Sequence, residues 1–135
     1  MLPSDFSLSS TGGRVFVVAA RLTLARTVIM TLRSFGYGTR FAPGLPFGWQ
    51  HTLTSFDLLI LVGSRPFWCN KRTFDICSAV RNESPELPII VVGQNNLEAK
   101  VRLLETVADD YIVEPFDPHE FLARVKGLIR RCQLH

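Results

Sequence analysis

Short apolar runs recur along the chain and alternate with longer segments of mixed polarity. The most apolar runs are residues 15–20 (VFVVAA), 56–62 (FDLLILV) and 88–92 (PIIVV). Continuous apolar runs of this length indicate β-strands that are buried on both faces. Two weaker runs, 38–42 and 111–113, are predicted to be the remaining strands, with 38–42 at an edge of the sheet.

The segments between these runs have apolar residues at helical spacing. Helices are predicted over residues 22–35, 73–82, 95–107 and from 118 onward. In the third of these, Leu97, Val101 and Leu104 fall on one side of the predicted helix. Residues 43–55 carry two prolines and two glycines, so any helix there should be short or distorted.

Residues 108–131 carry the clearest local signals. Pro115 ends the strand before it, because proline gives the sheet no hydrogen-bond donor. Asp117 is suited to cap a helix, Pro118 to begin it and Glu120 to complete a capping box. Strands that alternate with helices across short loops predict a five-stranded, doubly wound parallel α/β sheet. Such sheets bind ligands at the carboxyl ends of their strands.

The order of residues in this stretch is also distinctive. Residues 109–116 read DDYIVEPF, and the helix that follows ends in Arg130 and Arg131. The segment resembles the end of a receiver domain of two-component response regulators, closest to the OmpR/PhoB branch, except that the family has lysine where this chain has Glu114. The resemblance implies a flavodoxin-like receiver fold with strand order 2-1-3-4-5 and phosphorylation of an aspartate with Mg²⁺.

The resemblance also implies where the phosphorylation site would lie. It places the acidic pair at Ala19 and Ala20, the phosphoacceptor at Val62, the hydroxyl residue at Gly93 and the lysine at Glu114. Methyl groups and valine cannot ligate a hard cation or accept a phosphoryl group, and Glu114 would repel one. We therefore predict an atypical receiver, or pseudo-receiver, with no phosphotransfer, catalytic residue, metal or cofactor.

Two hypotheses concern what replaces the lost charges. One is that Arg21 or Arg65 forms an ion pair with Glu114, and the alternative is that Glu114 is merely solvated. Tyr111 stands at the family's switching aromatic position. Because Gly93 offers no hydroxyl to couple with, a fixed interface or surface role is favoured for Tyr111.

Branch members of this family dimerise through helix four, strand five and helix five, so the resemblance implies a homodimer through that face. The charged residues that match it by type are Lys100, Arg102, Glu105, Asp109, Asp110, Glu120, Arg124 and Arg130. Acids and bases alternate there, as a two-fold contact between identical surfaces requires. The alternative is ordinary surface charge paired within each helix.

The amino-acid composition limits the classes of protein to which the chain can belong. The chain has 135 residues, 47% of them hydrophobic, which predicts one globular domain over residues 14–132 behind a flexible lead-in, 1–13. Its mean hydropathy is +0.18. Apolar runs are too short to span a bilayer and no targeting segment is evident, so cytoplasmic localisation without membrane contact is predicted. Three cysteines without ligand spacing favour neither a disulfide framework nor a metal site.

The net charge of +3 and its distribution predict no nucleic-acid surface, because the arginines between residues 14 and 40 are scattered. No GxxxxGK or GxGxxG motif and no nucleophile with its base is present, so an enzyme is not predicted. The leading interpretation is a phosphorylation-independent dimerisation and regulatory module, the N-terminal part of a transcriptional regulator whose DNA contacts need a further domain. The alternative is a stand-alone module that binds a signalling partner or a small ligand.

Overall fold

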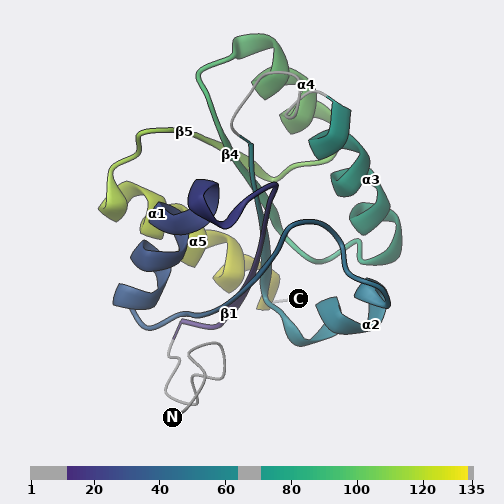
Figure 1. The fold of residues 1–135 in the computed structure, drawn as a ribbon, viewed down its shortest axis with the longest axis horizontal. Helices are drawn as coiled ribbons and strands as arrows, with labels where there is room; N and C mark the ends of the chain where they lie inside the picture. The colour runs from purple at the N-terminus through teal and green to yellow at the C-terminus, as the bar shows by residue number, and fades with distance from the viewer. Residues whose placement is uncertain (1–11, 64–70, 134–135) are drawn as a thin grey trace.

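The computed structural model describes residues 12–63 and 71–133 (Figure 1). The strands are β1 (Arg14–Ala19), β2 (Gly38–Ala42), β3 (Leu58–Val62), β4 (Ile89–Gly93) and β5 (Asp110–Val113). The helices are α1 (Leu22–Ser34), α2 (Trp49–Thr52), the 3₁₀ turn η2 (Leu53–Ser55), α3 (Thr73–Glu83), α4 (Leu97–Thr106) and α5 (Pro118–Gln133). No helix in these described ranges has the length and apolar character needed to cross a membrane.

The five strands form one sheet, all parallel, in the order β2-β1-β3-β4-β5. Helices α1 and α5 cover one face, and α2, η2, α3 and α4 cover the other (Figure 1). The predicted fold class and strand order are therefore confirmed, including the edge position of β2. Predicted strand and helix limits differ from the observed ones by one or two residues at most elements.

Burial on both faces explains why the central strands are apolar throughout. Val15 and Val17 of β1 pack toward α1 and α5, whereas Phe16 and Val18 pack toward the opposite helices. All four side chains are at most 1% exposed. Strand β3 begins two residues later than predicted, because η2 extends to Ser55 and Phe56 is its C-cap. The Asp57 carboxylate accepts the Arg14 backbone N–H at 2.9 Å.

The second helix is short, as predicted. Helix α2 makes a single turn before η2, and Gly48 ahead of it has a positive φ of 74°. That backbone conformation favours glycine, which has no Cβ to clash. Helix α4 departs from expectation in a different way. Its apolar stripe faces solvent, with Leu97 72%, Val101 42% and Leu104 37% exposed, while Ala99 and Leu103 are buried.

Arg81 of α3 joins two connections at the amino ends of β4 and β5. Its guanidinium donates hydrogen bonds to the carbonyl oxygens of Pro85, Leu87 and Val107 at 2.8–3.3 Å. It also pairs with Asp109 Oδ2 at 2.7 Å, and the same oxygen accepts the backbone N–H of Ile89 at 2.8 Å. One side chain therefore satisfies backbone acceptors that would otherwise lack partners at this end of the sheet.

We expect Arg81→Met to lower the free energy of unfolding by about 1–3 kcal/mol, because it leaves part-buried carbonyl oxygens and Asp109 without their donor. Urea unfolding followed by circular dichroism measures this change. Lys126→Met on the exposed side of α5 is the matched control and should change stability little. Equal midpoints for the two variants would show that Arg81 does not hold these connections.

Candidate functional site at the carboxyl ends of the strands

The sheet register brings the predicted site positions to one edge. Ala19 ends β1 opposite Val62, the last residue of β3, and Val62 pairs in turn with Val92. Gly93 ends β4 and lies beside β5, and its carbonyl oxygen accepts the Glu114 backbone N–H at 2.9 Å. Ala20 follows β1 directly and is exposed. All five predicted positions therefore lie at the carboxyl ends of the strands or directly after them.

The side chains at this edge offer few ligands. Ala19 and Val62 are at most 1% exposed and wholly apolar, and Glu114 is the only carboxylate among the five positions. A Mg²⁺ site requires several oxygen ligands in near-octahedral geometry. Within the described ranges no group of three or more His, Cys, Asp or Glu side chains could hold a metal, and the sequence of residues 64–70, SRPFWCN, adds no carboxylate. These residues do not fit a Mg²⁺ ion.

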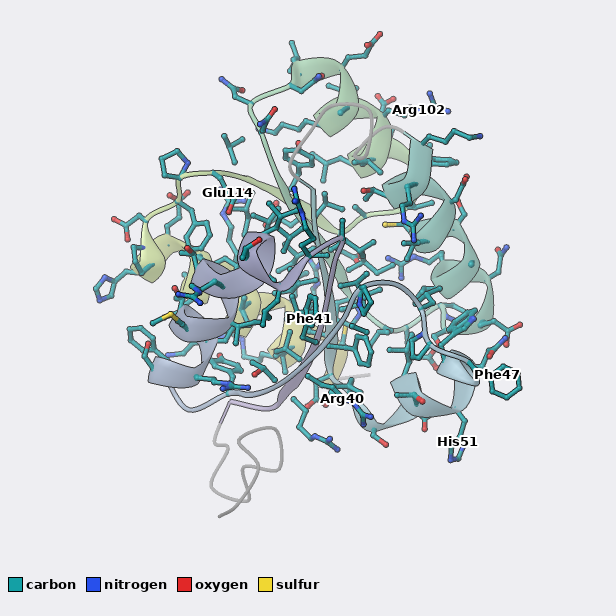
Figure 2. The ribbon with its side chains drawn as sticks, viewed as in Figure 1. Arg40, Phe41, Phe47, His51, Arg102 and Glu114 are labelled. Atoms are coloured by element: carbon teal, nitrogen blue, oxygen red, sulfur yellow. The ribbon has the colours of Figure 1, made fainter. Side chains whose placement is uncertain are left out.

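Glu114 is only partly exposed, and burial raises the pKa of its carboxyl group. It forms no ion pair with any described residue, and the predicted partner Arg21 is exposed. The second predicted partner, Arg65, lies outside the described residues, so that half of the hypothesis stays a prediction. The peptide bond between Glu114 and Pro115 is cis, and Figure 2 shows Glu114 on the loop after β5.

Tyr111 does not occupy the interface or surface position that the sequence favoured. Its side chain is 3% exposed and packs in the cluster that α3 and α4 form with the sheet. Its hydroxyl donates a hydrogen bond to the Gln94 carbonyl oxygen at 2.8 Å. The correction has a simple cause, since the side of β5 that carries Tyr111 is covered by α4. The ring therefore lies inside the core.

On the predicted α4–β5–α5 face, three charged residues come together within one chain. Arg124 of α5 donates to both Asp110 oxygens at 2.9 Å and to Glu120 Oε2 at 3.1 Å. These hydrogen bonds, that to Asp110 first, raise the pKa of Arg124. Beside them lies a hollow of 210 Å³ that Lys100 and Tyr111 help to line. The charge pairing expected across a dimer is thus available inside the monomer.

The remaining predicted interface residues divide between two sides. Asp109 and Arg130 line a second hollow beside Arg124, although Asp109 is already engaged by Arg81. Glu105 is exposed on α4. Arg102 lies over the Phe74 ring of α3, with its guanidinium carbon 5.0 Å from the ring centroid. Arg102 therefore lies on the α3 side of α4, away from β5 (Figure 2).

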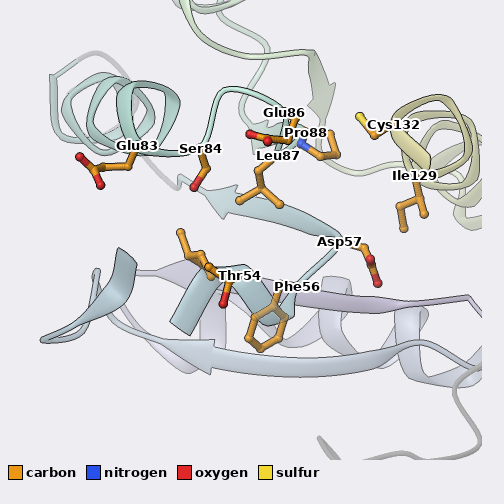
Figure 3. A pocket seen from close by; sticks show the side chains of 11 residues that line it. Thr54, Phe56, Asp57, Glu83, Ser84, Glu86, Leu87, Pro88, Ile129 and Cys132 are labelled. Carbon is orange, nitrogen blue, oxygen red and sulfur yellow. The ribbon is translucent and has the colours of Figure 1, made fainter. Parts of the chain in front are cut away.

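A separate hollow lies at the opposite end of the sheet, where β3 and β4 begin (Figure 3). It measures 410 Å³, and its walls and rim come from η2, the connection before β4 and α5. Its charged lining residues are Asp57, Glu83 and Glu86. Sequence reasoning gave no signal for this hollow, because its lining comes from three separate stretches of the chain, 53–57, 83–88 and 129–132.

The raised pKa of Glu114 predicts a pH-dependent effect of Glu114→Gln. The folded protein holds this proton more tightly than the unfolded chain, so its contribution to stability is lost as pH rises from the ordinary value of 4.5 through the folded pKa. We expect the Gln variant to gain stability over wild type at about pH 7.5 and to lose that advantage at about pH 4. Urea midpoints at the two pH values measure the difference.

Glu86→Gln, a substitution of an exposed glutamate, is the control and should keep the wild-type pH profile. A Glu114→Gln variant that is less stable than wild type at neutral pH would instead show that a cation stabilises the carboxylate, as the Arg65 hypothesis requires.

Comparison with known proteins finds similarity to response regulators and a transcriptional regulator. No family model matches the chain. It is 31% identical over 122 residues, or 87% of its length, to the response regulator ArlR of Staphylococcus saprophyticus, and 39% identical over 79 residues, or 58% of its length, to the transcriptional regulatory protein PcoR of Escherichia coli. The chain spans 53% of ArlR and 34% of PcoR, about half or less of these curated relatives.

Among solved structures, a putative response regulator from Chloroflexus aurantiacus is similar over 90% of this chain and 100% of that one. The two share 28% sequence identity with a TM-score of 0.75.

Proposed function

We propose that this chain, a response-regulator receiver domain with OmpR-like homologues, is a regulatory module that acts through protein contacts without an aspartyl phosphate. The observation that carries this proposal is the chemistry of the strand ends. Phosphoryl transfer to a receiver needs a carboxylate nucleophile and a metal that neutralises the phosphoryl oxygens. The strand ends instead carry Ala19, Val62 and Gly93, with a single carboxylate at Glu114 after β5.

Glu114 does not substitute for the missing aspartate in this proposal. It follows β5, where the family has a cation, and so lies two strands away from Val62 at the end of β3. Its raised pKa reflects an environment that disfavours the anion, and a dianionic phosphoryl group beside it would add repulsion. We assign no catalytic role to the chain.

Incubation with acetyl phosphate and Mg²⁺ is expected to leave the intact mass of the protein unchanged, because no residue at the strand ends can accept and stabilise the phosphoryl group. A typical receiver domain with its aspartate and lysine, treated in parallel, shows that the reagent is active. Addition of one acid-stable or acid-labile phosphoryl group to this chain would contradict the proposal, and peptide mapping would then identify the residue.

The contact surface that we propose is the α4–β5–α5 face. The exposed stripe of Leu97, Val101 and Leu104 runs along α4, beside the charged group of Asp110, Arg124 and Glu120. Exposed apolar stripes on an otherwise polar surface mark contact sites. A two-fold axis would place the stripe against its own copy, with the charged residues around it.

The free energies of apolar burial and of ion pairing indicate which part of this face drives association. Burying an aliphatic side chain contributes at most about 1.5–3 kcal/mol, and partial burial contributes less. An exposed ion pair contributes about 0–1 kcal/mol. Arg124 already has its partners in the monomer, so exchanging them across a dimer would yield little net free energy. The apolar stripe should therefore set the affinity, and the charges should set the orientation.

We expect the double variant Val101→Asp, Leu104→Asp to shift the monomer–dimer equilibrium strongly toward monomer, by at least tenfold in the dissociation constant, because it places carboxylates at the centre of the contact. Sedimentation equilibrium over a range of concentrations measures this. The control is Phe47→Asp, at a fully exposed aromatic far from α4, which should sediment like wild type (Figure 2). Loss of dimer in the control, or none in the double variant, would place the interface elsewhere.

In this proposal the domain regulates transcription, the activity named for the relative PcoR, and DNA is contacted by a separate domain as in OmpR-like response regulators. The homodimer would bring two such domains together on a two-fold symmetric site. Comparing operator binding by a full-length regulator with and without Val101→Asp, Leu104→Asp would connect the dimer to this activity.

A further inference from the structure

Charge is distributed unevenly along the described chain. Residues 12–56 contain no aspartate, glutamate or lysine, and their only charged side chains are arginines. These arginines are Arg14, Arg21, Arg26, Arg33 and Arg40. All the carboxylates of the described ranges come from residue 57 onward. The charged side chains of the edge built from α1 and β2 are therefore all cationic.

Two of these arginines border a groove between α1 and β2. The groove has a volume of 380 Å³. Its lining residues are Leu22, Arg26, Ile29, Met30, Arg33, Thr39 and Phe41. Leu22 and Met30 are 53% and 62% exposed, so the groove presents apolar surface to solvent between its two cations. Arg40 points to the other face of the sheet, since neighbouring β-strand side chains alternate.

Arg33 is held in place within this groove. Its Nε donates a hydrogen bond to Thr39 Oγ1 at 2.8 Å, and Thr39 is only 1% exposed. This bond orients the guanidinium. Neither Arg33 nor Arg26 makes an ion pair with a residue of the described ranges. The groove thus carries oriented positive charge without internal compensation.

The spacing of the two arginines indicates which surface features a binding partner must have. Arg26 and Arg33 are seven residues apart on α1, which places them on the same side of the helix about 10 Å apart along its axis. Met30 and Ile29 lie between them. A second helix lying along the groove meets both cations if it carries carboxylates seven residues apart with an apolar side chain midway between them.

We propose that the α1–β2 groove docks an acidic amphipathic helix of a partner protein. Two carboxylates of that helix pair with Arg26 and Arg33, and the apolar residue between them packs on Met30 and Ile29. Guanidinium groups bind carboxylates in a two-pronged geometry that a fixed Arg33 can offer without further ordering. The groove lies across the domain from the α4–β5–α5 face, so both contacts can form at once (Figure 1).

A protein partner fits this groove better than a nucleic acid. Backbone phosphates attract several cations in a row and gain nothing from exposed leucine and methionine. Here only two arginines border the groove, and the surface between them is apolar. Helix-in-groove recognition uses an apolar strip of this kind for affinity and flanking charges for orientation.

The test uses a fluorescein-labelled helical peptide with two glutamates seven residues apart and leucine midway between them. Fluorescence anisotropy with the full chain measures its dissociation constant. The double variant Arg26→Glu, Arg33→Glu is expected to weaken binding at least tenfold, and Met30→Ala to weaken it severalfold. Lys126→Glu, at an exposed position on α5, is the single-charge control and should bind like wild type.

A scrambled peptide of the same composition, whose glutamates no longer share a face, separates specific docking from net charge. Equal binding of the scrambled peptide, equal binding by the double variant, or no binding by wild type would each overturn the proposal. A duplex DNA fragment that binds the same arginines more tightly than the peptide would assign the groove to nucleic acid instead. If the double arginine variant does not fold, Arg26→Ala and Arg33→Ala give the same comparison.

The docking proposal and the dimer proposal are tested by different measurements, so one can be wrong while the other holds. Sedimentation of the arginine variants reports the dimer, and peptide binding by Val101→Asp, Leu104→Asp reports the groove. We expect each pair of substitutions to change only its own measurement.

Discussion

The structure depends on a parallel sheet that is buried on both faces. Parallel strands need helices on each side, so the residues of β1 after Arg14 and those of β3 and β4 face packed side chains and must be apolar up to the strand ends. In a phosphorylated receiver the same ends carry carboxylates, which are costly to bury unless a metal and a lysine compensate them. Here Ala19 and Val62 continue the core to the rim, so the sheet is satisfied without a ligand.

The charged residues of the chain are arranged around this core in local groups. Arg81 and Asp109 satisfy backbone atoms at the amino ends of the strands, and Arg124 holds Asp110 and Glu120 on the face of α5. Both groups pair their charges within one chain, so neither requires a second protein to neutralise them. The arginines of α1 differ, because the whole stretch from 12 to 56 provides no carboxylate to pair with them.

Much of the fold could be predicted from the sequence, because continuous apolar runs and capped helices have few alternative interpretations. The short second helix followed from the prolines and glycines of residues 43–55, whereas the strand order followed from the resemblance to receiver domains. Side-chain orientation on α4 did not follow, because Leu97, Val101 and Leu104 have the periodicity of a buried stripe, whereas Ala99 and Leu103 are the residues that pack on the sheet. Tyr111 was misplaced for the same reason, since the cover that α4 provides is a tertiary feature. The network of Arg81 joins segments that no local pattern connects.

A receiver domain that takes no phosphoryl group, as we propose for this chain, must be regulated in another way. A conformational equilibrium shifts only as far as a ligand binds one state better than the other, and in a typical receiver the phosphoryl group supplies that difference. On our proposal the strand ends supply no such difference, because Val62 at the end of β3 cannot accept a phosphoryl group and Tyr111 is buried with its hydroxyl bonded to the Gln94 carbonyl oxygen. On the functions that we propose, regulation comes from occupancy of two outer surfaces, and therefore from the concentrations of the chain itself and of its acidic partner.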